Sequence, residues 1–247
     1  MEVVYLLTAE IPSEFHCAQI TTFHMQNVGI HLKKIIYILF LGLILSCNSN
    51  KQLEGTWIGA YSYSENIESS MNLPIRSFVT FKNDNYFAKS FKYDYRAEKD
   101  FENGTFNYNW EKITYNSDNE YTNIVKSLNN DSLVIKGTDG SNNSVFKKLN
   151  DTLKNKAKNI KLIGKRYLVK SEKYNDTLNF INDTLLIKST DKTRNPGIRW
   201  ERINENGFDI LFMEMDIPLI IRNELNGKIV LTGFHKKTYN LELIELK

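Results

Sequence analysis

Hydrophobic and polar residues alternate with a period of two along most of the chain after residue 52. Between residues 105 and 110, for example, Phe106, Tyr108 and Trp110 alternate with small polar neighbours. Successive side chains of a β-strand point to opposite faces, so this period is typical of strands with one buried face. Short alternating runs separated by turn residues indicate an antiparallel sheet or barrel.

In the first half, aromatic residues are expected on the inner faces of three strands: Trp57, Tyr61 and Tyr63; Phe87, Phe91, Tyr93 and Tyr95; and Phe106, Tyr108 and Trp110. A strand that contains Ile75, Val79 and Phe81 precedes the second of these groups, and Asn83-Asp84-Asn85 predicts a tight turn between them. Further strands are expected at 120–128, 132–136 and 144–149.

The second half predicts eight strands, at 164–171, 177–181, 184–189, 198–203, 208–213, 218–222, 228–233 and 239–246. Asn206-Gly207 and Asn226-Gly227 predict hairpin turns, because both residues of each pair tolerate a positive φ. His235 falls between two of the expected strands and is interpreted as a solvated turn residue.

The two halves begin alike, with Leu53-x-Gly55 in the first and Leu162-x-Gly164 in the second. Eight strands of about 6–8 residues with short turns need about 75–100 residues, which is the size of each half. The sequence therefore predicts an all-β chain of two small antiparallel up-and-down eight-stranded barrels in tandem, following an N-terminal signal helix. The expected barrels cover 53–150 and 161–247, and a Lys/Asn-rich linker covers 151–160.

The N-terminal part has a different pattern. Lys33 and Lys34 precede an apolar run from Ile35 to Leu45, and Ser46 and Cys47 follow it. A membrane-spanning helix needs about 20 apolar residues, so this shorter run is more typical of a signal peptide.

Ile44-Leu45-Ser46-Cys47 resembles the lipobox of bacterial lipoproteins. The resemblance implies that residues 25–46 are removed as a signal peptide, that Cys47 carries acyl chains such as palmitate, and that 47–52 form a tether. Two or more acyl chains hold a protein stably on a membrane. The expected location is the cell envelope, on the outer membrane facing the periplasm, because Asn48 and not Asp follows the cysteine. Residues 1–24 carry no motif and are interpreted as upstream sequence foreign to the mature protein.

Residue types that the mature chain lacks exclude several functions. From residue 47 onward, Cys47 and His235 are its sole cysteine and histidine. An internal disulfide, a Cys/His zinc site and Cys–His catalysis are therefore excluded. The net charge of +3 is spread along the chain, so nucleic acid is not an expected partner.

No catalytic residue, metal site or cofactor is predicted, and the chain is not expected to be an enzyme. Carboxylates gather in one stretch, at Asp94, Glu98, Asp100 and Glu102, interleaved with Arg96 and Lys99. We interpret this stretch as a solvated loop and not as a pair of catalytic acids.

Leu53-x-Gly55-x-Trp57 at the start of an all-β lipoprotein resembles the lipocalin-like domains of bacterial lipoproteins. The resemblance implies that Trp57 packs across the closed end of the first barrel and that the open end admits a small apolar ligand. Arg166 stands where the second half would have this tryptophan, and Lys147 and Lys148 stand where lipocalins often place an arginine over it.

Two functions follow from this reading. In the first, the chain is a membrane-anchored binding module for a small apolar ligand or lipid, with Tyr61, Phe91, Tyr93 and Tyr108 as candidate ligand contacts. In the second, side chains fill the barrels, and the protein acts through loops on an envelope protein as an inhibitor or scaffold. Small barrels rich in large aromatic residues favour filled interiors.

Overall fold

Antiparallel strands make up nearly all of the structure, which is a computed structural model. It describes residues 49–65, 72–97, 99–137, 142–155, 160–170, 175–189, 197–225 and 227–247. The predicted signal peptide, Cys47, Glu98 and Asn226 lie outside these residues. Within the described ranges, no helix has both the length and the apolar character needed to span a membrane.

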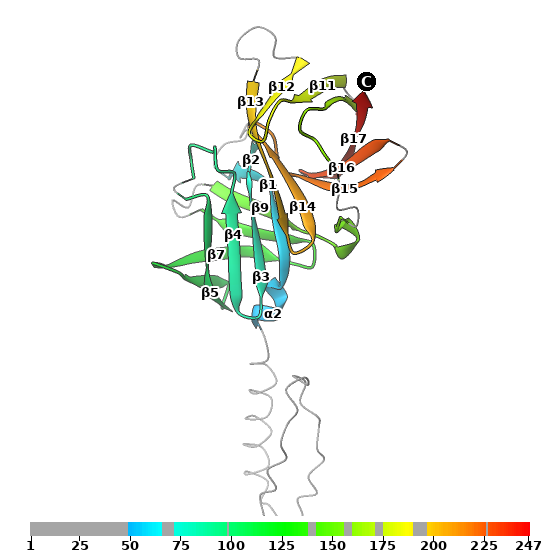
Figure 1. The fold of residues 1–247 in the computed structure, drawn as a ribbon. Coiled ribbons are helices and arrows are strands. Elements are labelled where there is room, and N and C mark those ends of the chain that lie inside the picture. The colour runs from blue at the N-terminus through cyan, green and yellow to red at the C-terminus, as the bar shows by residue number, and fades with distance from the viewer. Residues whose placement is uncertain are drawn as a thin grey trace, which may run out of the picture. The chain divides into compact units, whose positions relative to one another are not determined.

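The first barrel follows a short helix, α2 (Ser49–Leu53), and its strands neighbour one another in chain order (Figure 1). Pairing of the first strand with the last closes eight of its strands into a barrel, and the two-residue β2 adds to one edge of β1. The strands are β1 (Gly55–Ser64), β2 (Leu73–Pro74), β3 (Ser77–Lys82), β4 (Asn85–Ser90), β5 (Phe101–Asn109), β6 (Lys112–Asn116), β7 (Glu120–Leu128), β8 (Ser132–Lys136) and β9 (Asn142–Lys148).

A single 3₁₀ turn, η1 (Asp151–Leu153), follows the first barrel, and a second closed barrel of eight strands comes after it. Its strands are β10 (Arg166–Lys170), β11 (Asn175–Phe180), β12 (Leu185–Lys188), β13 (Gly197–Glu205), β14 (Phe208–Met213), β15 (Leu219–Leu225), β16 (Lys228–Phe234) and β17 (Thr238–Leu246). The predicted fold class of two tandem eight-stranded antiparallel barrels is therefore confirmed.

Alternation in the sequence explains most of these strands. In β8, Leu133 and Ile135 are buried and the residues between and after them are not. Turn chemistry explains the hairpins: Asn83, Asp84 and Asn206 have positive φ angles of 48°, 60° and 49°. Asn and Asp adopt this left-handed conformation more readily than other non-glycine residues.

Each barrel has its own interior core. The first-barrel core consists of Leu53, Trp57, Val79, Phe81, Tyr86, Phe106, Tyr108, Ile113, Tyr115, Val125, Leu133 and Ile135. The second-barrel core consists of Ile160, Leu162, Tyr167, Val169, Leu178, Phe180, Leu186, Ile198, Trp200, Leu211, Met213, Leu219, Ile221, Ile229, Leu231, Leu241 and Leu243.

A third apolar cluster joins the outer surfaces of the two barrels. This inter-barrel cluster consists of Ile58, Ala60, Phe78, Phe91, Leu149, Phe208, Ile210, Phe212, Ile220 and Phe234. The ring of Phe212 lies 6.2 Å from that of Phe78 and 6.1 Å from that of Phe91. Every residue of β14 is buried, because the second-barrel core covers one of its faces and the inter-barrel cluster covers the other.

Polar contacts accompany this apolar cluster. The ammonium of Lys89 lies 2.8 Å from the Glu201 carboxylate, and the backbone N–H of Lys92 donates to the same carboxylate at 3.2 Å. The amide of Asn206 donates to the hydroxyl of Thr56 at 3.3 Å. The two barrels thus belong to one compact unit.

Candidate functional site

One end of the first barrel is filled by Trp57 and by the segment that leads into β1. Trp57 has no exposed surface, and its indole N–H donates to the carbonyl oxygen of Leu53 at 2.6 Å. The ammonium of Lys148 lies 5.2 Å from the centre of the indole ring, within range of a cation–π interaction. We call this end of the barrel, which includes α2, the Trp57 end.

Tyr167 is the second barrel's counterpart of Trp57. It is 1% exposed, and its hydroxyl donates to the carbonyl oxygen of Lys161 at 2.9 Å, much as Trp57 bonds to the segment before its own strand. Arg166, which the sequence alignment set opposite Trp57, is exposed instead. Both halves share the Leu-x-Gly spacing, but the buried ring comes two residues after the glycine in the first half and three residues after it in the second.

The four aromatic residues suggested as ligand contacts do not share one surface. Tyr108 belongs to the first-barrel core, whereas Phe91 belongs to the inter-barrel cluster and Tyr61 and Tyr93 pack against that cluster. For Tyr61 the cause is a shift in the pairing of β1 with β9 between Gly59 and Tyr61. Such a bulge reverses the faces of the residues that follow, so Trp57 points inward and Tyr61 does not.

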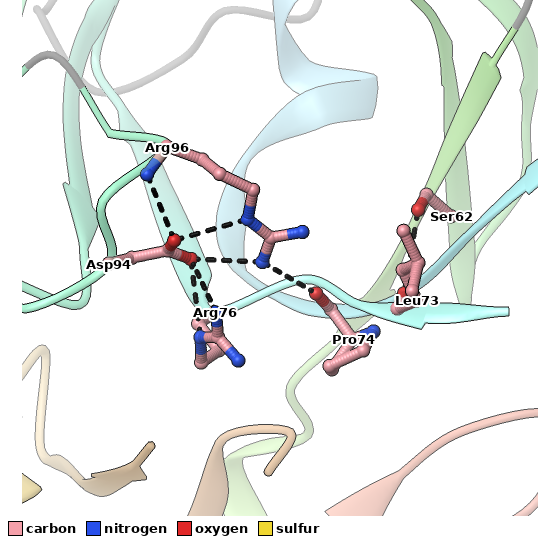
Figure 2. A network of polar contacts seen from close by, with 6 residues as sticks. All are labelled: Ser62, Leu73, Pro74, Arg76, Asp94 and Arg96. Carbon is pink, nitrogen blue, oxygen red and sulfur yellow. Dashed lines mark hydrogen bonds and ion pairs between the residues drawn. The ribbon is translucent and has the colours of Figure 1, made fainter. Parts of the chain in front are cut away.

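Phe91 and Tyr93 lie in a loop because β4 ends at Ser90, earlier than the alternation predicted. Figure 2 shows what holds this loop. The carboxylate of Asp94 accepts from the guanidinium of Arg76 at 3.1–3.2 Å and from that of Arg96 at 3.0–3.1 Å. Arg96 also donates to the carbonyl oxygen of Pro74 at 3.5 Å. The Asp94 side chain is buried, whereas those of Arg96, Asp100 and Lys99 are exposed, so the predicted solvated loop is wrong for Asp94.

The end of the first barrel opposite Trp57 holds a cavity of about 510 Å³, which we call the mouth cavity. Its apolar and aromatic lining comes from Phe78, Val79, Ala88, Phe101, Tyr115, Tyr121, Ile135 and Phe146. Its polar lining comes from Ser77, Lys89, Ser90, Lys99, Asp100, Glu102, Ser117, Asn119 and Asn123. None of Tyr61, Phe91, Tyr93 and Tyr108 is among these residues.

Glu102 is the best-defined polar group of the mouth cavity. One of its carboxylate oxygens accepts hydrogen bonds from the hydroxyls of Tyr86 at 2.7 Å and Ser117 at 2.5 Å. Its other oxygen accepts from the hydroxyl of Tyr121 at 2.9 Å. Strand register brings these groups together, since Glu102 pairs with Ala88 across β4 and β5, and Tyr121 pairs with Tyr115 across β6 and β7.

Stacked tyrosine rings form an aromatic wall beside this carboxylate. The rings of Tyr115 and Tyr121 are 4.8 Å apart and almost parallel, at 16°. Tyr86 meets Tyr115 edge to face, also at 4.8 Å. Tyr115 is buried, whereas Tyr121 is 38% exposed, so the wall runs from the barrel core to the solvent. A flat apolar group could stack on the exposed part of this wall.

The pKa values of the two tyrosines and of Glu102 shift in opposite directions. Burial, and then the hydrogen bond to Glu102, raises the pKa of Tyr86 to about 12. Burial and the same carboxylate raise the pKa of Tyr121 further above its usual value. Burial alone would raise the pKa of Glu102, but the hydrogen bonds from Ser117, Tyr86 and Tyr121 lower it on balance. At neutral pH the carboxylate is therefore charged and the phenols keep their protons.

Lys89 lies at the side of the mouth cavity, and its ammonium is paired. It is 2.8 Å from Glu201 of the second barrel and 3.6 Å from Asp100. With its side chain 8% exposed, this ammonium is already neutralised by two carboxylates. It couples the rim of the mouth cavity to the contact between the barrels and is not a free cation for an anionic ligand.

A smaller cavity of about 330 Å³ lies in the second barrel. Its apolar lining, which includes Leu178, Leu231 and Leu243, belongs to a core whose members are at most 8% exposed. Asp176 and the Lys188–Asp216 ion pair lie at its polar side. The core of the second barrel is therefore largely filled by its own side chains, and a cavity of about 480 Å³ lies beside Ile160, Leu162, Trp200 and Arg202.

Sequence reasoning missed the residues that line the mouth cavity. Glu102 was noticed only as one member of a charged stretch, and Ser117 lies in the turn between two strands. A signal was available in Tyr115 and Tyr121, which flank that turn at equal distance and must face each other across a hairpin.

Among the residues that the structure describes, no group of three or more His, Cys, Asp or Glu side chains could hold a metal ion. Comparisons of the chain with protein-family models, with curated proteins and with solved structures found no match. The geometry of the mouth cavity is therefore the basis for a proposal about function.

Proposed function

We propose that this chain is a lipid-anchored protein of the bacterial cell envelope whose first barrel binds a small, mainly apolar molecule in the mouth cavity. The cavity of about 510 Å³ at the end of the barrel opposite Trp57 carries the proposal. Ligand cavities of soluble proteins typically measure about 300–1,000 Å³ and combine apolar walls with a few fixed polar groups. The tyrosine wall and Glu102 match that description.

The charged groups of the mouth cavity further restrict the kinds of ligand that would suit it. Glu102 is ionised, Lys89 is neutralised by Asp100 and Glu201, and Lys99 is paired with Asp118, so the lining offers no unpaired cation to an anionic head group. A neutral or amine-bearing molecule with a flat apolar part suits the cavity best. Such a ligand would stack on Tyr121 and place its polar group near the Glu102 carboxylate.

Dye binding tests this site. N-phenylnaphthylamine, a neutral apolar dye that fluoresces strongly when it leaves water, should bind the purified protein. Tyr121→Ala removes half of the stacked pair and should weaken binding about tenfold, which corresponds to about 1.4 kcal/mol. Tyr95→Ala is the matched control, because Tyr95 is 91% exposed and lies outside the cavity lining. Equal dye binding by both variants would rule out the mouth cavity as the site.

The anchor is proposed from the Ile44-Leu45-Ser46-Cys47 motif and its position after an apolar run. Acylation of Cys47 would hold the barrels at the outer membrane, facing the periplasm. Labelled palmitate should enter the wild-type protein and not the Cys47→Ser variant, and this variant should leave the membrane fraction. Retention of Cys47→Ser in that fraction would contradict the anchor.

A second function, binding of an envelope protein through the loops, is favoured by the filled second barrel. If the wild-type protein takes up no dye and native mass spectrometry finds no bound small molecule, this function becomes the better explanation. Crosslinking in intact cells, with capture through a tag at the C-terminus, would then identify the partner.

A further inference from the structure

Trp110 is an exposed tryptophan in the turn between β5 and β6. It is 87% exposed, whereas the chain's other two tryptophans, Trp57 and Trp200, are 0% and 3% exposed. Trp110 and Glu111 have positive φ angles of 49° and 61°. Turns of this kind prefer Asn-Gly, and a bulky residue with positive φ costs about 1 kcal/mol. Folding alone therefore does not account for tryptophan at this position.

The chain enters the first barrel next to this turn. The hydroxyl of Ser49 donates to the carbonyl oxygen of Tyr108, and the backbone N–H of Tyr108 donates to the side-chain oxygen of Asn50 at 2.6 Å. The amide of Asn50 also donates to Asp84, in the turn between β3 and β4, at 2.7 Å. In Figure 1, α2 accordingly lies at the end of the barrel where β3 joins β4. Residues 49 and 50 are thus fixed to β5 two residues before Trp110.

Covalent geometry limits how far Cys47 can be from this point. Consecutive Cα atoms are about 3.8 Å apart, so the Cα of Cys47 is at most about 7.6 Å from that of Ser49. The Cα atoms of Tyr108 and Trp110 are separated by at most the same distance. An acyl chain on Cys47, which is part of the proposed function, would therefore enter the membrane at the same end of the first barrel as Trp110.

We propose that the turn containing Trp110 inserts into the interface of the phospholipid membrane that holds the acylated Cys47. Tryptophan favours this region because its ring is apolar and its N–H can bond to the head-group layer. Exposed Lys51, Lys82 and Lys112 lie on α2 or at strand ends beside the same turns, which also carry the exposed Asp84 and Glu111, so the apolar ring of Trp110 and not net charge carries the proposed contact. Insertion would orient the first barrel with its Trp57 end on the membrane and its mouth cavity away from it.

Fluorescence quenching by brominated lipids tests this contact in the full acylated protein. Vesicles of phosphatidylethanolamine and phosphatidylglycerol are prepared with and without phosphatidylcholine brominated near the head group. Trp110 is the exposed tryptophan, so bromolipid should quench a large part of the emission, and emission should shift to shorter wavelength on vesicle binding. The Trp110→Phe variant should bind the same vesicles and lose both effects, because Trp57 and Trp200 remain buried.

Mass spectrometry of the mature N-terminus separates the two proposals. If Cys47 carries acyl chains and the protein binds vesicles, but bromolipid quenches the wild-type protein no more than Trp110→Phe, insertion of the turn is wrong and the anchor stands. If Cys47 carries no acyl chain, the anchor and the insertion of Trp110 both fail. Quenching of the wild-type protein, with no quenching of Trp110→Phe, supports the insertion.

Discussion

A single carboxylate, Asp94, holds the loop that follows β4 against the first barrel. Both of its oxygens accept hydrogen bonds from Arg76 or Arg96, and this fixes the loop that carries Phe91 into the inter-barrel cluster. The sequence showed the charged residues but not their burial. Burial of Asp94 depends on where β4 ends and on the packing of the loop. Neither feature can be predicted from the alternation of apolar and polar residues.

Asp94→Asn is expected to destabilise the protein by about 2–3 kcal/mol at neutral pH, because it leaves the buried Arg76 guanidinium without its counter-charge. Hydrogen bonds from Arg96 and the charge of Arg76 outweigh burial and lower the pKa of Asp94. The stabilisation is therefore present above the unfolded-state pKa, about 3.9, and is lost as the pH falls through the lower native pKa.

Urea unfolding of the wild-type protein and Asp94→Asn between pH 7 and pH 3 measures this difference. The gap in unfolding free energy should stay constant down to about pH 5 and shrink below about pH 4. Asp118→Asn is the control, because the Asp118 side chain is 84% exposed and its pair with Lys99 should matter by less than about 0.5 kcal/mol. A gap that widens as the pH falls would contradict this account of Asp94.

Strands and turns could be predicted well where a run alternates without interruption. The strands β7, β8 and β14 have the predicted bounds, and the turns at Asn83 and Asn206 have the expected positive φ. Prediction failed where the pairing changes within a strand. The bulge in β1 places Tyr61 on the outer face, and Trp110 continues the alternation of β5 but lies in the turn that ends it. At a bulge or a turn the apolar and polar residues still alternate along the sequence, but their side chains no longer point to the expected inner or outer face of the barrel.

The turn at Trp110 and Glu111 offers a test of this element. Glu111 has a φ of 61°, so Glu111→Gly relieves the steric cost of a side chain there and should stabilise the protein by about 0.5–1 kcal/mol. Glu111→Ala removes the same carboxylate but keeps a Cβ, so it should leave stability almost unchanged. The midpoints of urea denaturation compare the two variants, and equal stabilisation by both would point to the lost charge as the cause.

At the scale of the whole molecule, the fold class followed from alternation, turn spacing and the length of each half. The contact between the barrels did not. The run Phe208–Met213 is apolar at nearly every position, which is typical of a strand buried on both faces, but the sequence does not say what covers the second face. The mouth cavity was also beyond prediction, because its lining comes from seven strands whose register a sequence leaves open.

Phe212→Ala tests whether the two barrels unfold together. Phe212 is fully buried between the barrels, so its truncation should cost about 3–5 kcal/mol, mainly in the contact that couples them. Trp57 and Trp200 report separately on the first and second barrels when Trp110 is replaced by Phe.

In that background the two tryptophans should report one shared urea transition in the parent protein and two separate transitions in Phe212→Ala. Phe101→Ala is the matched control, because Phe101 is 55% exposed, and it should keep the shared transition. A single transition at the parent's midpoint in Phe212→Ala would show that the inter-barrel cluster does not couple the barrels.

The two-sided burial of β14 has a consequence for the order of folding during synthesis. A chain synthesised from its N-terminus delivers the first barrel about a hundred residues before the second is complete. Until β14 has been synthesised and has folded, Phe78 and Phe91 remain part of an exposed apolar patch on the first barrel. The second barrel covers this apolar patch when it docks, so a chaperone that binds exposed apolar surface would act only before that step.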